Sequence, residues 1–318
     1  MTSRMCVLGE CMLEVSAEGL TSSNVAASMS YGGDTLNTAV YYARMGGAVN
    51  YLSALGDDSL SGWMIDRWRA EGVGCDWVRR EPGAAPGLYL IQVDELGERS
   101  FVYWRENSPA RALLQNADQL IRLLTDATLD ANLLYLSGIT LALMNSAARN
   151  ALFEFIRGFR GGGGSVAFDS NHRPALWTDD VTATSVYEQM YAHTDIALST
   201  AEDEYHLFGG SKPNDIVERL QSIGVQEIII KDGDEGCLLF SAGEKLQVPA
   251  LQVDVVDTTA AGDSFNAAYL VSRSQGLNTL SAVKNGHALA GAVIGHRGAI
   301  VPESAMPRLP EVLGIEGK

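Results

Sequence analysis

An aspartate next to a turn of small residues is the strongest indication of chemistry in this sequence. The stretch 253–270, VDVVDTTAAGDSFNAAYL, opens with a β-branched run at 253–256 that predicts the end of a strand, and from Ser264 its apolar spacing predicts a helix. Small residues let backbone approach a ligand closely, and the unpaired N–H groups at a helix start attract an anion. Asp263 stands within this anion site, where a carboxylate can orient or deprotonate a hydroxyl. The alternative is an ordinary helix whose acidic first turn contributes about 0.3–1 kcal/mol. The small residues of the turn are Ala260, Ala261 and Gly262.

The segment DTTAAGDSF resembles the C-terminal signature of the PfkB (ribokinase-like) family of carbohydrate kinases, commonly DTxGAGD. Ala260 stands where many relatives have glycine, a variant within the keto-deoxygluconate kinase branch. The resemblance implies that Asp263 is the catalytic base and that the three small residues of the turn bind the nucleotide. In some relatives a monovalent cation lies beside this turn. Asp257 and Thr259 match its usual ligands, and whether this chain uses K⁺ is left open.

A second polar cluster follows a glycine pair near the N-terminus. In YGGDTLNTAV, Gly33 is followed by Asp34 and Asn37 at the start of a helix with apolar spacing. Glycine admits a ligand against the backbone, and carboxylate and amide groups suit sugar hydroxyls. The segment resembles the family's sugar-binding motif, which implies substrate-binding roles for these three residues. From the residues alone, an N-cap aspartate with an asparagine on a wet helix face is the alternative.

Two extended segments joined by a polar loop predict a β-hairpin at about 87–105. Period-two alternation places Phe101, Tyr103 and Arg105 on one face of the second strand, with Tyr89 on its partner. In this family such an insertion is a lid over the sugar, so the resemblance implies that Tyr89, Tyr103 and Arg105 bind substrate. Simple packing of aromatic residues is the alternative, although a face that ends in an arginine is less easily explained as core.

The segment DSNHRPALW, residues 169–177, follows a predicted strand and therefore lies at the carboxyl edge of the sheet, where open α/β folds bind ligands. Arg173 precedes a proline, which favours an extended backbone and lets the side chain project. The segment resembles a DxNxRxxLW pattern of keto-deoxygluconate kinases, and a surface arginine in a loop is the alternative. Arg105 and Arg173 favour a ketoaldonic acid over a neutral sugar, because a guanidinium pairs well with a carboxylate.

Further segments match the nucleotide side of the family. STAE stands where relatives commonly have NxxE, so Glu202 matches the glutamate that helps hold the hydration sphere of Mg²⁺, and Ser199 replaces the asparagine at the nucleotide contact. A carboxylate in the first turn of a helix is the alternative for Glu202. KDGDEG resembles the nucleotide-phosphate turn. The residues that this turn and the last predicted helix assign to the nucleotide are Lys231, Gly233, Gly236 and, beside the adenine, Asn285.

Short apolar strands alternate regularly with helices from residue 133 onward, which favours a mainly parallel sheet with helices on both faces. A chain of 318 residues with 46% hydrophobic content can bury one large core. With the resemblance, the expected fold is a single ribokinase-like α/β domain over 1–318 that carries a β-hairpin lid.

The acidic composition argues against nucleic-acid and membrane partners. A net charge of −16 and a pI near 4.7 disfavour binding to phosphate backbones or anionic lipids, which requires clustered cations. The four cysteines form no CxxC pair and the five histidines are scattered, so neither a disulfide framework nor a transition-metal site is expected. A reducing cytoplasm fits this usage, and no stretch has the length of a signal peptide or membrane span.

Taken with the resemblance, these features predict an ATP- and Mg²⁺-dependent kinase that phosphorylates 2-keto-3-deoxy-D-gluconate at its 6-hydroxyl. A ribokinase- or fructokinase-type enzyme for a neutral sugar is the first alternative. A sugar sensor without catalysis on the same scaffold is the second, against which the retained Asp263 argues. Assembly into a homo-oligomer is left open.

Overall fold

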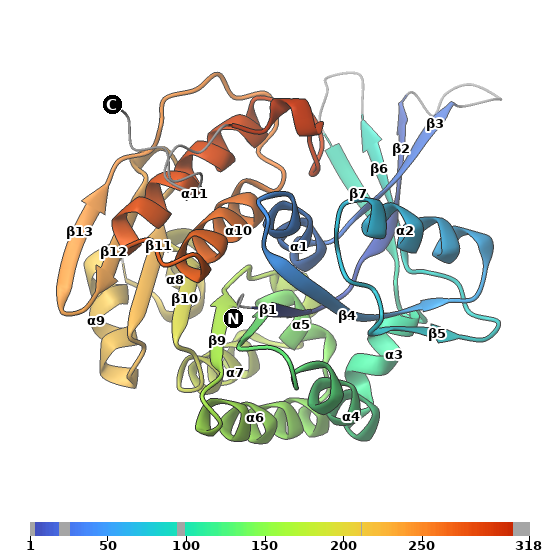
Figure 1. Cartoon of the computed structure of the whole chain (residues 1–318), viewed down its shortest axis with the longest axis horizontal. Helices are drawn as coiled ribbons and strands as arrows, with labels where there is room; N and C mark the ends of the chain where they lie inside the picture. The colour runs from blue at the N-terminus through green and yellow to red at the C-terminus, as the bar shows by residue number, and fades with distance from the viewer. Residues whose placement is uncertain (1–3, 19–25, 94–98, 211, 308–318) are drawn as a thin grey trace.

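A nine-stranded sheet runs through the centre of the molecule (Figure 1). The computed structural model describes residues 4–18, 26–93, 99–210 and 212–307. Within these ranges the strands pair in parallel, except that β12 is antiparallel to both of its neighbours. In spatial order the strands are β13 (Glu244–Val248), β12 (Cys237–Ser241), β11 (Glu227–Lys231), β10 (Ile196–Thr200), β9 (Ser165–Asp169), β8 (Leu133–Ser137), β1 (Arg4–Leu8), β4 (Ala48–Gly56) and β5 (Val78–Glu81).

The central strands are apolar along their length because both of their faces are covered. Met5 on β1 lies between Val49 of β4 and Leu133 of β8, and all three side chains are buried. This arrangement confirms the predicted mainly parallel sheet.

Helices cover both faces of the sheet, as predicted (Figure 1). None of the helices in the described part of the chain has the length and apolar character needed to cross a bilayer. One face carries α1 (Asp34–Arg44), α2 (Ser59–Ala70), α10 (Ala261–Ser274) and α11 (Thr279–Ile294). The other face carries α3 (Pro109–Gln115), α4 (Ala117–Ala127), α5 (Gly138–Leu143), α6 (Ser146–Gly161), α7 (Asp180–Tyr191), α8 (Ala201–Phe208) and α9 (Pro213–Ile223).

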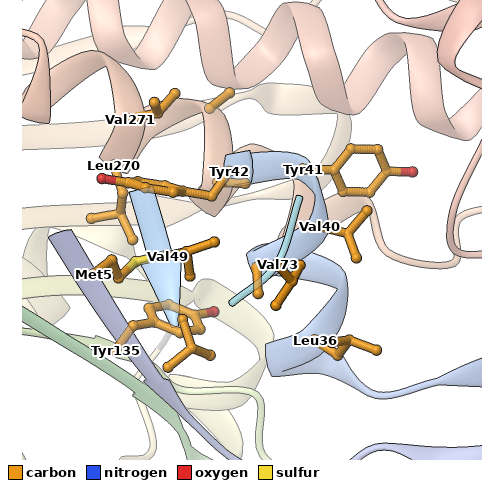
Figure 2. Packing of buried hydrophobic residues seen from close by; sticks show 14 of the residues in the cluster. Met5, Leu36, Val40, Tyr41, Tyr42, Val49, Val73, Tyr135, Leu270 and Val271 are labelled. Atoms are coloured by element: carbon orange, nitrogen blue, oxygen red, sulfur yellow. The ribbon is translucent and has the colours of Figure 1, made fainter. Parts of the chain in front are cut away.

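The packing of α1 against α10 matters most for function. Figure 2 shows Tyr42 of α1 beside Leu270 of α10, with Tyr135 of the sheet below them. The hydroxyl of Thr38 on α1 donates to the Tyr135 hydroxyl at 3.2 Å and lies 3.2 Å from the backbone oxygen of Asp263. The first turns of two helices that are distant in sequence are therefore held together above the sheet.

The predicted hairpin is part of a larger sheet. Strands β6 (Leu88–Val93) and β7 (Arg99–Trp104) pair antiparallel as expected, but they belong to a four-stranded sheet in the order β3-β2-β6-β7. Strand β2 (Met12–Glu18) pairs parallel with β6 and antiparallel with β3 (Ala27–Gly32). The sequence analysis missed β2 and β3, whose mixture of small, polar and apolar residues gives a weak strand pattern. The predicted loop at 94–98 lies outside the described residues.

The predicted strand end at 253–256 is wrong. This segment forms no strand and pairs with no strand of the described chain, and Val255 and Val256 are 60% and 55% exposed. The backbone N–H groups of Val256 and Asp257 donate instead to the carbonyl of Ile294 at the end of α11. β-Branched residues favour extended backbone, but the preference does not supply a partner strand.

Candidate active site

The first turns of α1 and α10 meet near the carboxyl ends of β9 and β11. The predicted acid and sugar-binding cluster come together here, because Asn37 on α1 donates its side-chain N–H to Oδ2 of Asp263 on α10 at 2.8 Å. Gly33 precedes α1, where a Cβ would stand 2.4 Å from the carbonyl oxygen of Glu10. Only glycine fits at this position, and it lets α1 start directly against the end of β1.

Asp263 is a buried carboxyl with an unusual affinity for its proton. Its pKa is raised to about 8, first by burial and next by the negative charge of Asp34. The charge of Asp169 acts in the same direction, whereas the hydrogen bond from Asn37 and the charge of Lys231 oppose it. Such a group is suited to exchanging a proton with a hydroxyl near neutral pH.

Asp34 receives a hydrogen bond that the sequence analysis did not predict. The side-chain amide of Asn171 donates to its Oδ2 at 2.8 Å across 137 positions. Asn171 lies within the DSNHRPALW segment, two residues before Arg173, and its φ of 26° is outside the usual region for a non-glycine residue. The segment itself was the available signal, but only Arg173 was selected from it.

Lys231 reaches the site from the end of β11. Its Nζ lies 3.3 Å from Oδ1 of Asp169 and 3.0 Å from Oδ1 of Asn266 on α10. Burial raises the pKa of Asp169, and the charge of Lys231 opposes that shift. The predicted phosphate-binding lysine therefore lies beside α10, and Asp169 and Asn266, which the sequence analysis did not select, hold it there.

The turn before α10 has the geometry of an anion cradle. Ala260 is the N-cap in the left-handed conformation, with φ 59° and ψ 18°, and no side chain caps the first N–H groups of this 14-residue helix. A Cβ on Gly262 would lie 3.5 Å from Nζ of Lys231, so backbone and lysine face one small space. Uncapped amides beside a lysine fit a nucleotide phosphate.

Glu202 lies exposed in the first turn of α8, and its role beside hydrated Mg²⁺ stays a prediction. The described residues contain no cluster of three or more acidic, histidine or cysteine ligands. A single carboxylate such as Glu202 fits Mg²⁺ in the manner common for nucleotide enzymes, in which one or two carboxylates bind the ion together with the substrate phosphates.

Asp257 and Thr259 are hydrogen-bonded to one another. Oδ1 of Asp257 accepts from the Thr259 hydroxyl at 2.6 Å and from its N–H at 3.1 Å, and Oδ2 accepts from the N–H of Gly298 at 2.9 Å. These bonds fix the loop that leads into the anion cradle. The K⁺ site expected from the resemblance stays a prediction.

Two residues predicted to contact the nucleotide are buried and have partners inside the protein, and their nucleotide roles stay predictions. Ser199 is completely buried, and its hydroxyl lies 2.8 Å from that of Tyr191. Asn285 is 3% exposed and donates to the Ser272 hydroxyl at 3.0 Å, which places its amide between α10 and α11. Motif position alone did not reveal that these polar groups already have partners inside the protein.

The two glycines of the KDGDEG turn both have left-handed backbone. Gly233 has φ 56° and is exposed, while Gly236 has φ 93° and a Cβ there would stand 2.1 Å from the carbonyl oxygen of Val248. The close approach of β13 therefore explains Gly236 without a nucleotide. Their predicted nucleotide contacts are not tested by this geometry.

The aromatic residues of β6 and β7 have the predicted arrangement on one face of the sheet. Tyr89 and Tyr103 are directly opposite in the β6–β7 register with ring centroids 5.8 Å apart, and the Arg105 guanidinium lies 5.9 Å from the Tyr103 ring centre. Arg105 follows the end of β7 and is buried in an ion pair with Glu10, whose carboxylate also accepts from Ser108. The sequence analysis missed Glu10, because nothing local in sequence indicates a partner 95 positions away.

Arg173 is exposed. Its backbone is extended, with φ −131°, as the following proline predicted, and its guanidinium donates to the carbonyl oxygen of His172 at 2.8 Å. Among the described residues no carboxylate oxygen lies within 4.0 Å of the Arg173 guanidinium. Its charge is therefore not neutralised by the protein, in contrast to that of Arg105.

A central sheet that carries a buried acid beside an anion cradle, together with a second sheet, has parts expected of a sugar kinase. The sequence pattern described as pfkB family carbohydrate kinase matches residues 2–306, and the chain belongs to this family of carbohydrate kinases.

Among curated relatives, 2-dehydro-3-deoxygluconokinase of Escherichia coli (strain K12) is 41% identical over 315 residues, which cover 96% of this chain and 100% of that protein. The protein of the same name from Dickeya dadantii (strain 3937) is 42% identical over 314 residues, covering 96% of this chain and 99% of that one. Among solved structures, fructokinase with bound ATP from Xylella fastidiosa has a TM-score of 0.83 at 24% identity, covering 99% of this chain and 98% of that chain. The likeness confirms the ribokinase-like fold.

Proposed function

We propose that this protein transfers the γ-phosphoryl group of ATP to the 6-hydroxyl of 2-keto-3-deoxy-D-gluconate. The observation that carries the chemistry is the buried Asp263 carboxyl beside the uncapped start of α10. The choice of substrate is supported by the near full-length relatives named 2-dehydro-3-deoxygluconokinase, which are 38–42% identical.

In the proposed reaction the sugar hydroxyl lies against Asp263, which orients it and accepts its proton. The bond from Asn37 fixes the carboxylate, so little reorganisation is needed. The α10 amides and Lys231 face the phosphate oxygens, where charge is concentrated in a loose transition state. Bound Mg²⁺, with Glu202 near its hydration sphere, would neutralise phosphate charge.

We assign recognition of the sugar acid to the start of α1, the second sheet and the segment that follows β9. Gly33, Asp34 and Asn37 would bind hydroxyls, and the lid tyrosines Tyr89 and Tyr103 would cover the carbon chain. Arg105 and Arg173 would pair with the carboxylate. Because Glu10 already neutralises Arg105 in part, we assign the larger share of carboxylate binding to Arg173.

The buried Glu10–Arg105 pair also supports a neutral sugar as the second candidate substrate, since it reduces the local positive charge. A coupled ADP-release assay with Mg²⁺ and a panel of the keto acid, its C4 epimer, fructose and ribose separates the two. We expect kcat/KM to be highest for a keto acid and the Asp263→Asn variant to be strongly impaired on all sugars. A higher value for fructose or ribose would overturn the substrate assignment, and no turnover on any sugar would overturn the enzyme assignment.

We further propose that the protein works in the cytoplasm and that K⁺ binds beside Asp257. The four cysteines are buried free thiols, which suits a reducing compartment. Replacing Na⁺ with K⁺ in the same assay tests the cation, and equal rates in both salts would contradict it. Sedimentation of the intact protein would show whether it assembles.

A further inference from the structure

Asn171 connects two parts of the site that are far apart in sequence. Its Nδ2 donates to Oδ2 of Asp34 at 2.8 Å, in the same way that Asn37 donates to Asp263. Among the described residues, Oδ1 of Asp34 accepts no hydrogen bond, so one oxygen of this carboxylate is left for a ligand. Each of the two neighbouring carboxylates is thus held by the amide of one asparagine.

The loop that carries Asn171 is firmly anchored by Ser170. The Ser170 carbonyl accepts from the Tyr187 hydroxyl at 2.6 Å, and its side-chain oxygen accepts from the N–H of Thr200 at 3.1 Å. The Ser170 hydroxyl also donates to Asp203 at 2.7 Å. A Cβ on Gly138 would stand 2.0 Å from the Ser170 carbonyl oxygen, so α5 closes on the loop from its other side.

This anchoring explains how Asn171 can keep a φ of 26°. A non-glycine residue in this region is strained, and such strain persists only where the surroundings over-determine the backbone. The strained backbone and the hydrogen bond from the Asn171 amide to Asp34 together indicate that this residue matters for the contact that its side chain makes.

We propose that Asn171 is a positioning residue that holds the Asp34 carboxylate at a fixed place beside Asp263, so that Asp34 can accept a hydrogen bond from a sugar hydroxyl. The proposal deepens the proposed function and rests on it. Asn171 acts through Asp34 and not on the reacting atoms.

The charged and titratable groups that face Asp263 are few. They come from α1, β8, β9 and β11 and are Asp34, Tyr41, Tyr135, Asp169 and Lys231. Of the other charges, that of Asp34 contributes most to the raised pKa of Asp263. A change in the position or charge environment of Asp34 should therefore appear in the pH dependence of catalysis.

The test compares Asn171→Gly with Asn171→Asp. Glycine adopts this backbone without strain and removes the amide, so we expect an unchanged or slightly raised melting temperature and a fall in kcat/KM for the sugar of roughly 10- to 100-fold, the usual effect of losing a hydrogen bond to a charged group. KM for ATP should not change. Aspartate adds a third carboxylate beside Asp34, so the acidic limb of the kcat/KM profile should move to higher pH.

Asn116→Ala is the matched control, because this exposed asparagine caps α4 far from the site. It should lower the melting temperature and leave the pH profile unchanged. All variants are measured on whichever sugar the wild-type protein phosphorylates best, so an error in the keto-acid assignment leaves the test intact. Wild-type kcat/KM in Asn171→Gly, or an unmoved acidic limb in Asn171→Asp, would overturn the proposal.

Discussion

Asn37 on α1 donates a 2.8 Å hydrogen bond to Asp263 on α10, across 226 positions of the chain. Each residue stands near the start of its helix, and the packing of the two helices brings them together. The bond fixes a carboxyl that is buried and lies near other negative charges. The properties of this carboxyl lead to the first prediction.

Asp263→Asn should lower kcat by about two to four orders of magnitude, the range for removing a positioned acid or base. It should also raise the melting temperature at pH 8. The folded pKa of about 8 lies above the ordinary 3.8, so this carboxyl contributes most stability below pH 3.8 and loses that contribution as the pH rises to 8. Asparagine cannot ionise, so its advantage over aspartate should shrink toward pH 5.

Kinetics and thermal melts at pH 5 and pH 8 check both parts. An active Asp263→Asn protein of normal stability would remove Asp263 from the role of base. For the wild-type protein, kcat/KM should fall as the pH drops through the Asp263 pKa, because the base must be ionised to accept a proton.

Ala260→Gly should stabilise the protein modestly, whereas Ala260→Val should destabilise it. The left-handed conformation, φ 59°, costs a residue with a Cβ about 1–2 kcal/mol, and glycine gives back about 0.5–1 kcal/mol through its more flexible unfolded chain. The net gain is therefore about 1 kcal/mol or less in urea unfolding. Ala242→Gly, at φ 51° in the β12–β13 turn, is the matched control and should give a similar gain. A large loss for Ala260→Gly alone would mean that the methyl group packs usefully.

Arg173→Ala should lower kcat/KM for the keto acid by about 30-fold or more. This loss corresponds to the lower end of the about 2–5 kcal/mol that it costs to remove one partner of a buried charge pair, here the pair of Arg173 with the substrate carboxylate. Activity on fructose and the melting temperature should stay the same, because Arg173 is exposed and forms no ion pair among the described residues. Arg122→Ala, an exposed arginine on α4, is the control. Equal losses on charged and neutral sugars would exclude carboxylate recognition by Arg173.

Arg105→Ala should destabilise the protein by about 3–5 kcal/mol, because it leaves the buried Glu10 carboxylate without its cation. The double variant Glu10→Gln and Arg105→Met removes both charges and should recover most of this loss. Urea unfolding measures the stabilities. If Arg105 also binds substrate, the double variant stays weak on the keto acid despite its recovered stability, and full activity would assign Arg105 to structure alone.

The sequence determined the elements and the acid. Apolar periodicity gave the parallel strands and most helices, and the small turn before α10 identified Asp263, because these signals lie in neighbouring residues. The local pattern misled at 253–256, where a β-branched run forms no strand, and at β2 and β3, whose residues alternate weakly.

Only the tertiary structure decided which polar groups remain free for a ligand. Ser199 and Asn285 match motif positions, yet Tyr191 and Ser272 already satisfy them in the interior. Asn171 and Glu10, in contrast, became visible only through partners 137 and 95 positions away. A hydrogen bond or ion pair between distant residues depends on how helices and strands pack, and a local pattern of residue types does not encode that packing.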